Sequence, residues 1–175
     1  MFSKSKIATL ILGITLASTA AFAGGADSKL FLKNAARNGA AEVSLAQLSL
    51  RMASNPELQD FSKQLIEDHT ATNNSLQELA KADKISLHKD LSPKQKETEK
   101  ELAKKNDMGR AFDRAYLQQT IEDHQKAIKA YEKQAKNGTD ADVRAFASET
   151  LPKLKKHLDM AAVLSTKLNA KNQEN

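Results

Sequence analysis

Apolar residues recur every three or four positions along most of the chain, which is the period of an amphipathic α-helix. One such stripe begins with Leu58, Phe61 and Leu65, and similar stripes follow further along. No segment alternates between apolar and polar residues for long, so the pattern does not predict strands. The pattern predicts four long helices, over residues 28–53, 56–83 and 110–136 and from a capping segment at 139–142 to residue 169. It also predicts one short helix over residues 93–105.

Local signals set the starts of these helices. Asn55 precedes Pro56, which places a capping side chain directly before a proline at the first helical position. Ser92 and Pro93 repeat the signal before the short helix. Asp27 is expected to cap the first helix, because its side chain can accept from backbone N–H groups of the first turn.

Three further signals concern the second half of the chain. A break between helices is predicted at residues 106–109, and the pair Asn137 and Gly138 is expected to end the fourth helix. Pro152 lies inside the last helix. A proline there removes a backbone hydrogen bond and should kink the helix.

Four amphipathic helices bury four apolar stripes most simply as a four-helix bundle. The connections at 54–55 and 137–140 are short, so the helices that they join should be antiparallel neighbours. The segment 84–109 is long enough to span the ~42 Å length of a 28-residue helix. It therefore allows the second and fourth helices to be parallel, as in ferritin-like folds with one long crossover. We expect an all-α, ferritin-like four-helix bundle over residues 24–169 and a polar tail at 170–175.

Residues 1–23 have the features of a secretory signal peptide that is cleaved after Ala23. Lys4 and Lys6 form a basic start, an apolar stretch follows, and Ala21 and Ala23 supply the small residues at the cleavage site. The apolar stretch is shorter than the ~20 residues that span a bilayer, which argues against a retained membrane anchor. We expect export to the periplasm and no transmembrane segment in the mature chain.

The composition narrows the function classes. The 175 residues include no cysteine, which excludes a disulfide scaffold, a thiol nucleophile and cysteine-based zinc or iron–sulfur sites. The net charge of +5 falls to +3 when Lys4 and Lys6 leave with the signal peptide, because 25 basic and 22 acidic residues remain. No aromatic residue lies within a basic cluster, so nucleic acid is not an expected partner.

Three of the four histidines lie on the apolar stripes of long helices. His69, His124 and His157 each have apolar residues three or four positions away, so their side chains should point into the bundle. Glu42 and Asn38 occupy positions of the first helix where its stripe should be apolar. Glu42 and the three histidines lie near the midpoints of their helices. Antiparallel packing should therefore bring these four side chains to one layer.

Three imidazoles and one carboxylate are the ligand types and number that bind a divalent transition metal such as zinc, iron or copper. We expect Asp68 and Asp123, each one residue before a histidine, as outer partners of this layer, and His88 in the crossover as a solvated residue. The same four residues could also form a hydrogen-bonded polar network without metal. A metal-dependent enzyme would need an open coordination position and an access path. The sequence leaves these alternatives open.

Di-iron chemistry is not expected. Ferritin-like di-iron proteins use Glu-x-x-His on two helices, whereas the residues three positions before the histidines here are Ile66, Ile85, Ile121 and Leu154. We therefore predict no catalytic residues. The tetrapeptide at 66–69 recurs at 121–124, a match too short to show a duplication.

Several stretches together carry a family resemblance: Asn34 to Val43, Phe61 to Thr70, Phe112 to Tyr116, Asp123-His124, and Phe146 to Leu158. In these the chain resembles a widespread family of exported bacterial proteins with a single domain of unknown function, often labelled outer-membrane proteins. The resemblance covers about Ser28 to Leu164. It implies a ferritin-like fold but no established activity, and the family motifs include Glu42, His69, His124 and His157.

Two functional interpretations follow. The first is a non-enzymatic metal-binding or stress-related periplasmic protein centred on the polar layer. The second is an envelope interaction or chaperone-like module whose polar layer is purely structural. The second interpretation predicts an exposed apolar patch on a long helix, whereas the first predicts a compact polar centre in a closed bundle.

Overall fold

The computed structural model of the chain describes residues 25–105 and 110–170. The predicted signal peptide, the predicted break at 106–109 and residues 171–175 of the predicted tail lie outside these ranges. Within them all regular structure is helical, as predicted, and no strand is present. The helices are α1 (Ala26–Met52), α2 (Pro56–Ala82), α3 (Pro93–Ala103), α4 (Arg110–Asn137) and α5 (Ala141–Ala170).

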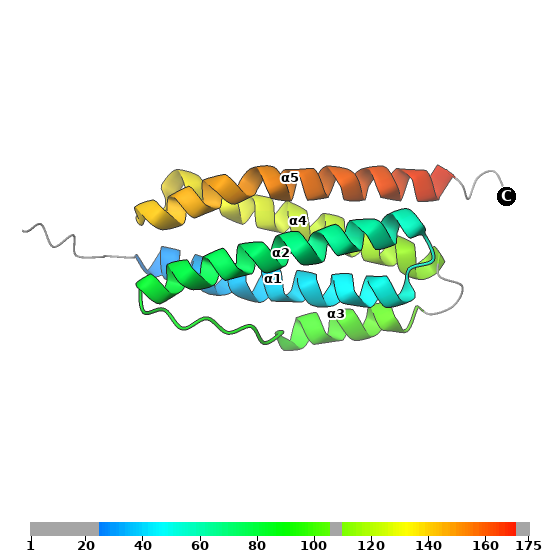
Figure 1. Cartoon of the computed structure of the whole chain (residues 1–175), viewed down its shortest axis with the longest axis horizontal. Helices are drawn as coiled ribbons and strands as arrows, with labels where there is room; N and C mark the ends of the chain where they lie inside the picture. Colours follow the sequence, from blue (N-terminus) through cyan, green and yellow to red (C-terminus); the bar gives the residue numbers. More distant parts are fainter. Residues whose placement is uncertain (1–24, 106–109, 171–175) are drawn as a thin grey trace, which may run out of the picture.

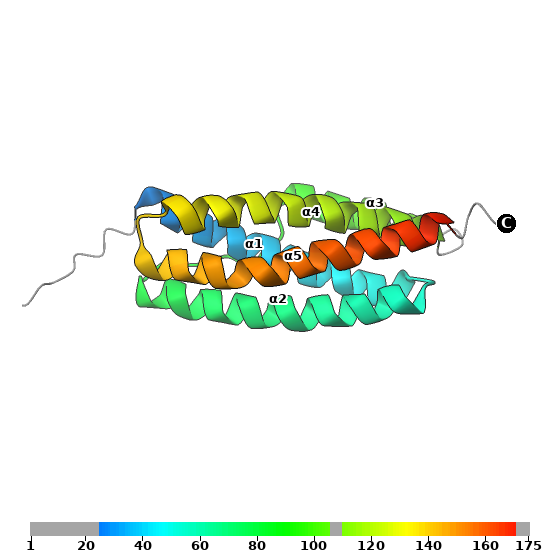
Figure 2. The same ribbon diagram turned by 90° about the horizontal axis from the view of Figure 1, so that it is seen from above.

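The four long helices lie side by side as a helical bundle (Figures 1 and 2). α1 packs mainly on α2, and α4 packs mainly on α5, while α1 also faces α4 and α2 faces α5. Residues 83–92 and α3 return the chain to the opposite end of the bundle before α4 begins (Figure 1). α2 and α4 therefore run in the same direction, as the long connection allows. α3 lies outside the four-helix layer, against α1 and α4.

The predicted capping signals are confirmed at three helices. Asn55 Oδ1 accepts from the N–H groups of Glu57 at 2.8 Å and Leu58 at 3.3 Å. Ser92 forms a reciprocal capping box with the third residue of α3. At α5, the N–H of Val143 donates to Asp140 Oδ1 at 2.9 Å. These helices begin where the side chains satisfy first-turn N–H groups.

The prediction for Asp27 is wrong. The N-cap of α1 is Gly25, whose carbonyl accepts from Ser28 at 2.9 Å, and no side chain caps the helix. The helix thus starts earlier than expected, and Asp27 lies in its first turn. A carboxylate there still interacts favourably with the positive end of the helix dipole. Asp27 is therefore favourable both at the expected N-cap position and at its observed position in the first turn.

α5 runs from Ala141 to Ala170 across Pro152 without a break. Pro152 is exposed, so water can reach the backbone carbonyl that the proline leaves without an intrahelical partner. The helix also includes Ala170, which the sequence assigned to the tail.

The hydrophobic core consists of two clusters that lie on either side of the predicted polar layer. One contains Leu65, Leu117 and Ala161, and the other contains Leu76, Ile128 and Leu154. On each of α2, α4 and α5 a histidine lies between the residues of the two clusters. The apolar stripes of these helices are therefore interrupted at one common level.

A buried carboxylate ties the first helical hairpin to the start of α4. Asp113 accepts from the Ser54 N–H at 3.1 Å, the Ser54 hydroxyl at 2.7 Å and the Asn55 N–H at 3.1 Å. Asp113 is buried, and hydrogen bonds to a charged group are stronger than neutral ones. This contact fixes the turn between α1 and α2 against α4.

We expect Asp113→Ala to lower the free energy of unfolding by about 3 kcal/mol, because three hydrogen bonds to a buried carboxylate are lost. Urea unfolding followed by circular dichroism measures this change. Arg114→Ala, at the exposed neighbouring position, is the control and should change stability by less than about 0.5 kcal/mol. Equal stability of the two variants would contradict the assigned role.

Candidate metal centre

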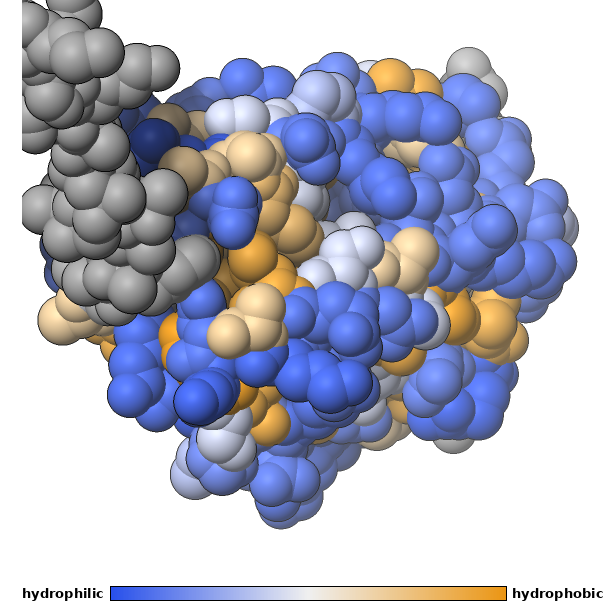
Figure 3. All heavy atoms as spheres, turned by 60° about the vertical axis from the view of Figure 1, so that its left-hand side comes forward, coloured by the Kyte–Doolittle hydropathy of each residue, from blue (hydrophilic) through white to orange (hydrophobic). Residues whose placement is uncertain are grey.

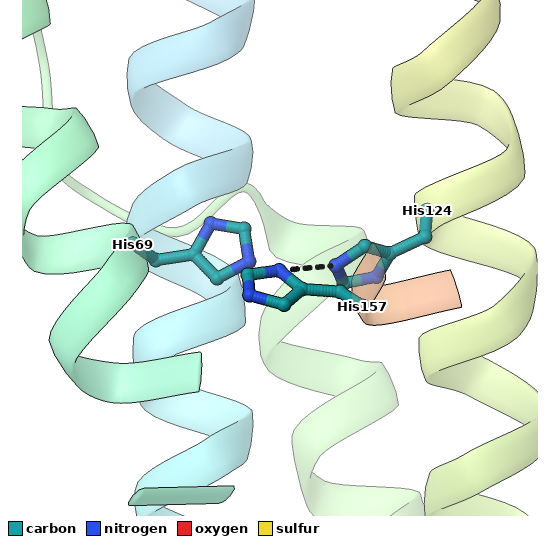
Figure 4. A group of neighbouring side chains, drawn as sticks. All are labelled: His69, His124 and His157. Atoms are coloured by element: carbon teal, nitrogen blue, oxygen red, sulfur yellow. Dashed lines mark hydrogen bonds between the residues drawn. The ribbon is translucent and has the colours of Figure 1, made fainter. Parts of the chain in front are cut away.

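Three helices each contribute one histidine to a common point in the bundle interior. His69 of α2, His124 of α4 and His157 of α5 are 7%, 1% and 0% exposed. Their ring centroids are 5.3 to 5.5 Å apart. One nitrogen from each ring lies within 4.8 Å of the others, and the rings point toward one another (Figure 4). The structure thus brings together three of the four predicted site residues.

The hydrogen bonds of two rings fix which nitrogens carry protons. His124 Nδ1 lies 2.9 Å from the Thr120 carbonyl oxygen, so this nitrogen must donate. His157 Nε2 lies 2.9 Å from Asp68 Oδ2 and must donate as well. A neutral imidazole has a single N–H. His124 Nε2 and His157 Nδ1 are therefore both lone-pair nitrogens, and they face each other across 3.4 Å (dashed line in Figure 4).

Two facing lone pairs repel each other unless a cation lies between them. Burial lowers the pKa of His124 to about 4, and the neighbouring His157 lowers it further. Burial also lowers the pKa of His157, although its hydrogen bond to Asp68 opposes the shift. A shared proton is thus disfavoured at neutral pH. A tetrahedral zinc ion with Zn–N bonds of about 2.0–2.1 Å places two nitrogens about 3.3–3.4 Å apart, which matches the observed separation.

The third ring has an unsatisfied nitrogen. His69 Nε2 is buried and has no hydrogen-bond partner within the described part of the chain. Burial, followed by the two neighbouring imidazoles, lowers the pKa of His69 to about 3. A buried polar atom without a partner costs about 1–3 kcal/mol. A metal ion at the centre of the three rings would give this nitrogen a partner.

Asp68 supports the cluster from outside. Its Oδ2 accepts from His157, and its Oδ1 lies 3.0 Å from Lys153 Nζ. Partial burial raises the pKa of Asp68, but the hydrogen bonds from His157 and Lys153 outweigh it and hold the pKa below its usual value. Metal-binding histidines commonly donate their second N–H to a carboxylate or a backbone carbonyl. His157 and His124 show these two arrangements.

Glu42 lies beside the cluster without joining it. Its Oε1 lies 3.8 Å from His124 Nδ1. This is the nitrogen that donates to the Thr120 carbonyl, whereas the other nitrogen of the ring faces His157. Burial raises the pKa of Glu42 to about 8, and the negative charge of Asp123 adds to the shift. Glu42 is therefore a neutral acid at pH 7. Its predicted role as a metal ligand stays a prediction.

The two aspartates of the repeated tetrapeptide have different surroundings. Asp68 contacts His157, as expected for an outer partner. Asp123 instead accepts from Gln119 Nε2 at 2.7 Å and lies 3.4 Å from Lys126 Nζ. Asp123 thus lies near Glu42 of the predicted layer, whose pKa its charge raises, and both residues line the space between α1 and α4.

The two other polar residues named from the sequence, His88 and Asn38, both lie at the surface. His88 is exposed in the crossover, as expected. The expectation that Asn38 points inward is wrong, since it is exposed and accepts from Gln95 Nε2 at 3.2 Å. The apolar pattern of the first helix could not predict this, because it does not show that α3 packs on α1 and brings Gln95 to that face.

Sequence reasoning also missed two groups that orient the rings. The Thr120 carbonyl is four residues before His124 in α4, so the helical period could have identified it. Lys153 precedes His157 by four residues on α5 and reaches Asp68 of α2. This contact requires knowing that α2 and α5 are neighbours.

Residues 15–164 match the family described as Domain of unknown function (DUF4142). The chain belongs to this family. The DUF4142 match includes Glu42 and all three clustered histidines, and it begins within the predicted signal peptide. No curated protein and no solved structure shows detectable similarity to the chain. Over the described residues, no helix is both long and apolar enough to cross a membrane.

The shifted pKa of Glu42 gives a testable pH dependence. Glu42 stays protonated in the folded protein up to about pH 8, whereas its ordinary pKa is 4.5. Its stabilising contribution is therefore complete below about pH 4.5 and is lost as the pH rises through 8. Between pH 5.5 and 8.5, metal-free wild type should lose about 3 kcal/mol of unfolding free energy relative to Glu42→Gln.

Urea unfolding in the presence of a chelator measures this difference at the two pH values. Glu67→Gln, at an exposed position of α2, is the matched control and should follow wild type. A constant difference between wild type and Glu42→Gln across the range would show that Glu42 ionises normally in the folded protein.

Proposed function

We propose that this protein binds one divalent transition metal ion, such as zinc, iron or copper, between His69, His124 and His157. The observation that carries the proposal is the pair of facing lone-pair nitrogens, His124 Nε2 and His157 Nδ1, 3.4 Å apart. Each of these rings directs its single N–H away from the other. Imidazole suits zinc, copper and iron among the metals of proteins.

The electrostatics of the site favour a metal ion over a proton. The three imidazoles are neutral at pH 7, because their pKa values are lowered by burial. Metal ions bind neutral imidazole, so the same burial that disfavours a proton leaves the nitrogens free to coordinate. Asp68, charged and paired with Lys153, would strengthen His157 as a ligand.

The proposed role is metal binding in the periplasm and not redox turnover. The absence of Glu-x-x-His from the sequence argues against di-iron ferroxidase chemistry. The parallel direction of α2 and α4 and the single long crossover support a ferritin-like bundle. The basic start, apolar stretch and small cleavage residues of the predicted signal peptide support export.

The alternative of an interaction or chaperone-like module receives less support. Figure 3 shows a face that is mainly hydrophilic, with hydrophobic areas between hydrophilic residues. Among the described residues, the exposed large hydrophobic side chains are Leu30 and Val163. They lie near opposite ends of the bundle, since Leu30 lies four residues after the start of α1 and Val163 lies seven residues before the end of α5 (Figure 1). They do not form one apolar patch.

The metal content of mature, untagged protein purified from periplasm without chelator tests the proposal. We expect about one metal ion per chain and a rise in melting temperature when metal is added, because a ligand at 100 times its Kd adds about 2.7 kcal/mol. Metal-free protein that melts identically with and without added zinc, copper or iron would overturn the proposal.

Three variants separate a specific site from surface binding. His124→Ala should lose the bound metal. Asp68→Asn keeps all three ligands and should weaken metal affinity by about 10- to 100-fold. His88→Ala removes an exposed histidine and should retain the full metal content. Equal metal content in all three variants would place the metal elsewhere.

A further inference from the structure

A cleft leads from the surface to the histidine cluster. Its volume is about 620 Å³, and it is lined mainly by residues of α1 and α4. His69 and His124 are both among its lining residues. The volume greatly exceeds the ~30 Å³ that one water molecule occupies and lies in the range of ligand-binding sites. The cluster is thus buried within the bundle and yet adjoins an open space.

The cleft adjoins the side of the cluster that lacks an imidazole. α2, α4 and α5 each supply one histidine, whereas α1 has none. In Figure 4, α1 passes behind the ring of His69 as the pale blue ribbon. A tetrahedral ion held by three histidines keeps one further position. On the side of the cluster toward α1, the protein has no imidazole that could fill this fourth position.

The walls of the cleft include carboxamide side chains. Asn38, Asn73 and Gln119 line it from α1, α2 and α4. Asn73 lies directly against the backbone of α1, since a Cβ added at Gly39 would be 2.1 Å from Asn73 Oδ1. Carboxamide NH₂ groups are hydrogen-bond donors, so the walls can hold a small polar ligand.

The charges around the site favour a negatively charged ligand. Three neutral imidazoles leave the charge of a divalent ion uncompensated, and Asp68, which contacts His157, is paired with Lys153. On the cleft walls, Lys126 lies within 4 Å of carboxylate oxygens of both Glu122 and Asp123. Asp68 is therefore balanced by one lysine, and Lys126 partly balances Glu122 and Asp123, before a metal ion arrives.

We propose that a small anion enters through this cleft and completes the coordination of the metal ion at the side that faces α1. The inference rests on the proposed metal site and goes beyond it, because it assigns an open coordination position and an access path. Such a centre can exchange ligands with solvent, whereas a closed structural site cannot.

Azide titration of the copper(II)-loaded protein tests this inference, with metal content measured first. Azide bound to copper(II) gives a charge-transfer absorbance. We expect a saturable signal with one azide per metal ion in wild type. Asn38→Trp places a bulky ring on the cleft wall at an exposed position and should weaken azide affinity by at least about 10-fold. Its copper content should remain that of wild type.

Matched controls separate obstruction of the cleft from other effects of tryptophan. Asn74→Trp changes the same residue type at an exposed position of α2 that is not among the cleft-lining residues. It should change azide affinity by less than about 2-fold. If Asn38→Trp does not fold, Ala130→Trp obstructs the cleft from α4, with exposed Ala145→Trp of α5 as its control.

The outcomes distinguish the two proposals. Wild type that binds none of copper, zinc and iron overturns both the metal site and the anion site. Wild type that binds copper but gives no azide signal overturns the anion site alone, and leaves an internal group such as Glu42 to complete the coordination. Equal azide affinity in the cleft variant and its control shows that the anion does not enter between α1 and α4.

Discussion

The interior of this bundle is organised around the contact between His124 and His157. Each ring directs its N–H outward, one to the Thr120 carbonyl and the other to Asp68, so two lone pairs meet at 3.4 Å. The first partner is fixed by the backbone of α4, and the second by the packing of α2 on α5. The charge preference of the centre is therefore set by one backbone carbonyl and one carboxylate, which the helix packing holds against the two rings.

Packing and chemistry at this level are coupled through burial. The same hydrophobic clusters that stabilise the bundle exclude water from the three rings, and this lowers the pKa values of His69 to about 3 and of His124 to about 4. Charging these rings with protons would oppose folding, whereas a coordinated metal ion would satisfy the nitrogens. Asp113 and the capping side chains hold the hairpins in the register that keeps the rings together.

The sequence predicted the features that depend on local structure. Asn55 and Ser92 marked helix starts because a cap acts within one turn, and the positions of the three histidines near helix midpoints predicted their common level. The sequence could not distinguish the surroundings of Asp68 from those of Asp123, because both residues follow the same Ile-Glu pair. Their difference arises because Asp68 lies on the side of α2 that faces His157 of α5, whereas Asp123 lies on the side of α4 that faces α1. The exposure of Asn38 and the cleft likewise depend on how distant segments pack.

The polar layer also divides the hydrophobic core into two clusters, one toward each end of the long helices. The helices continue through the division, and on α2, α4 and α5 an imidazole separates the two clusters. Each end of the bundle can therefore open locally without disrupting the apolar contacts of the other, as cooperative units of different local stability do. An ion bound by α2, α4 and α5 at the division would join the two ends into one cooperative unit.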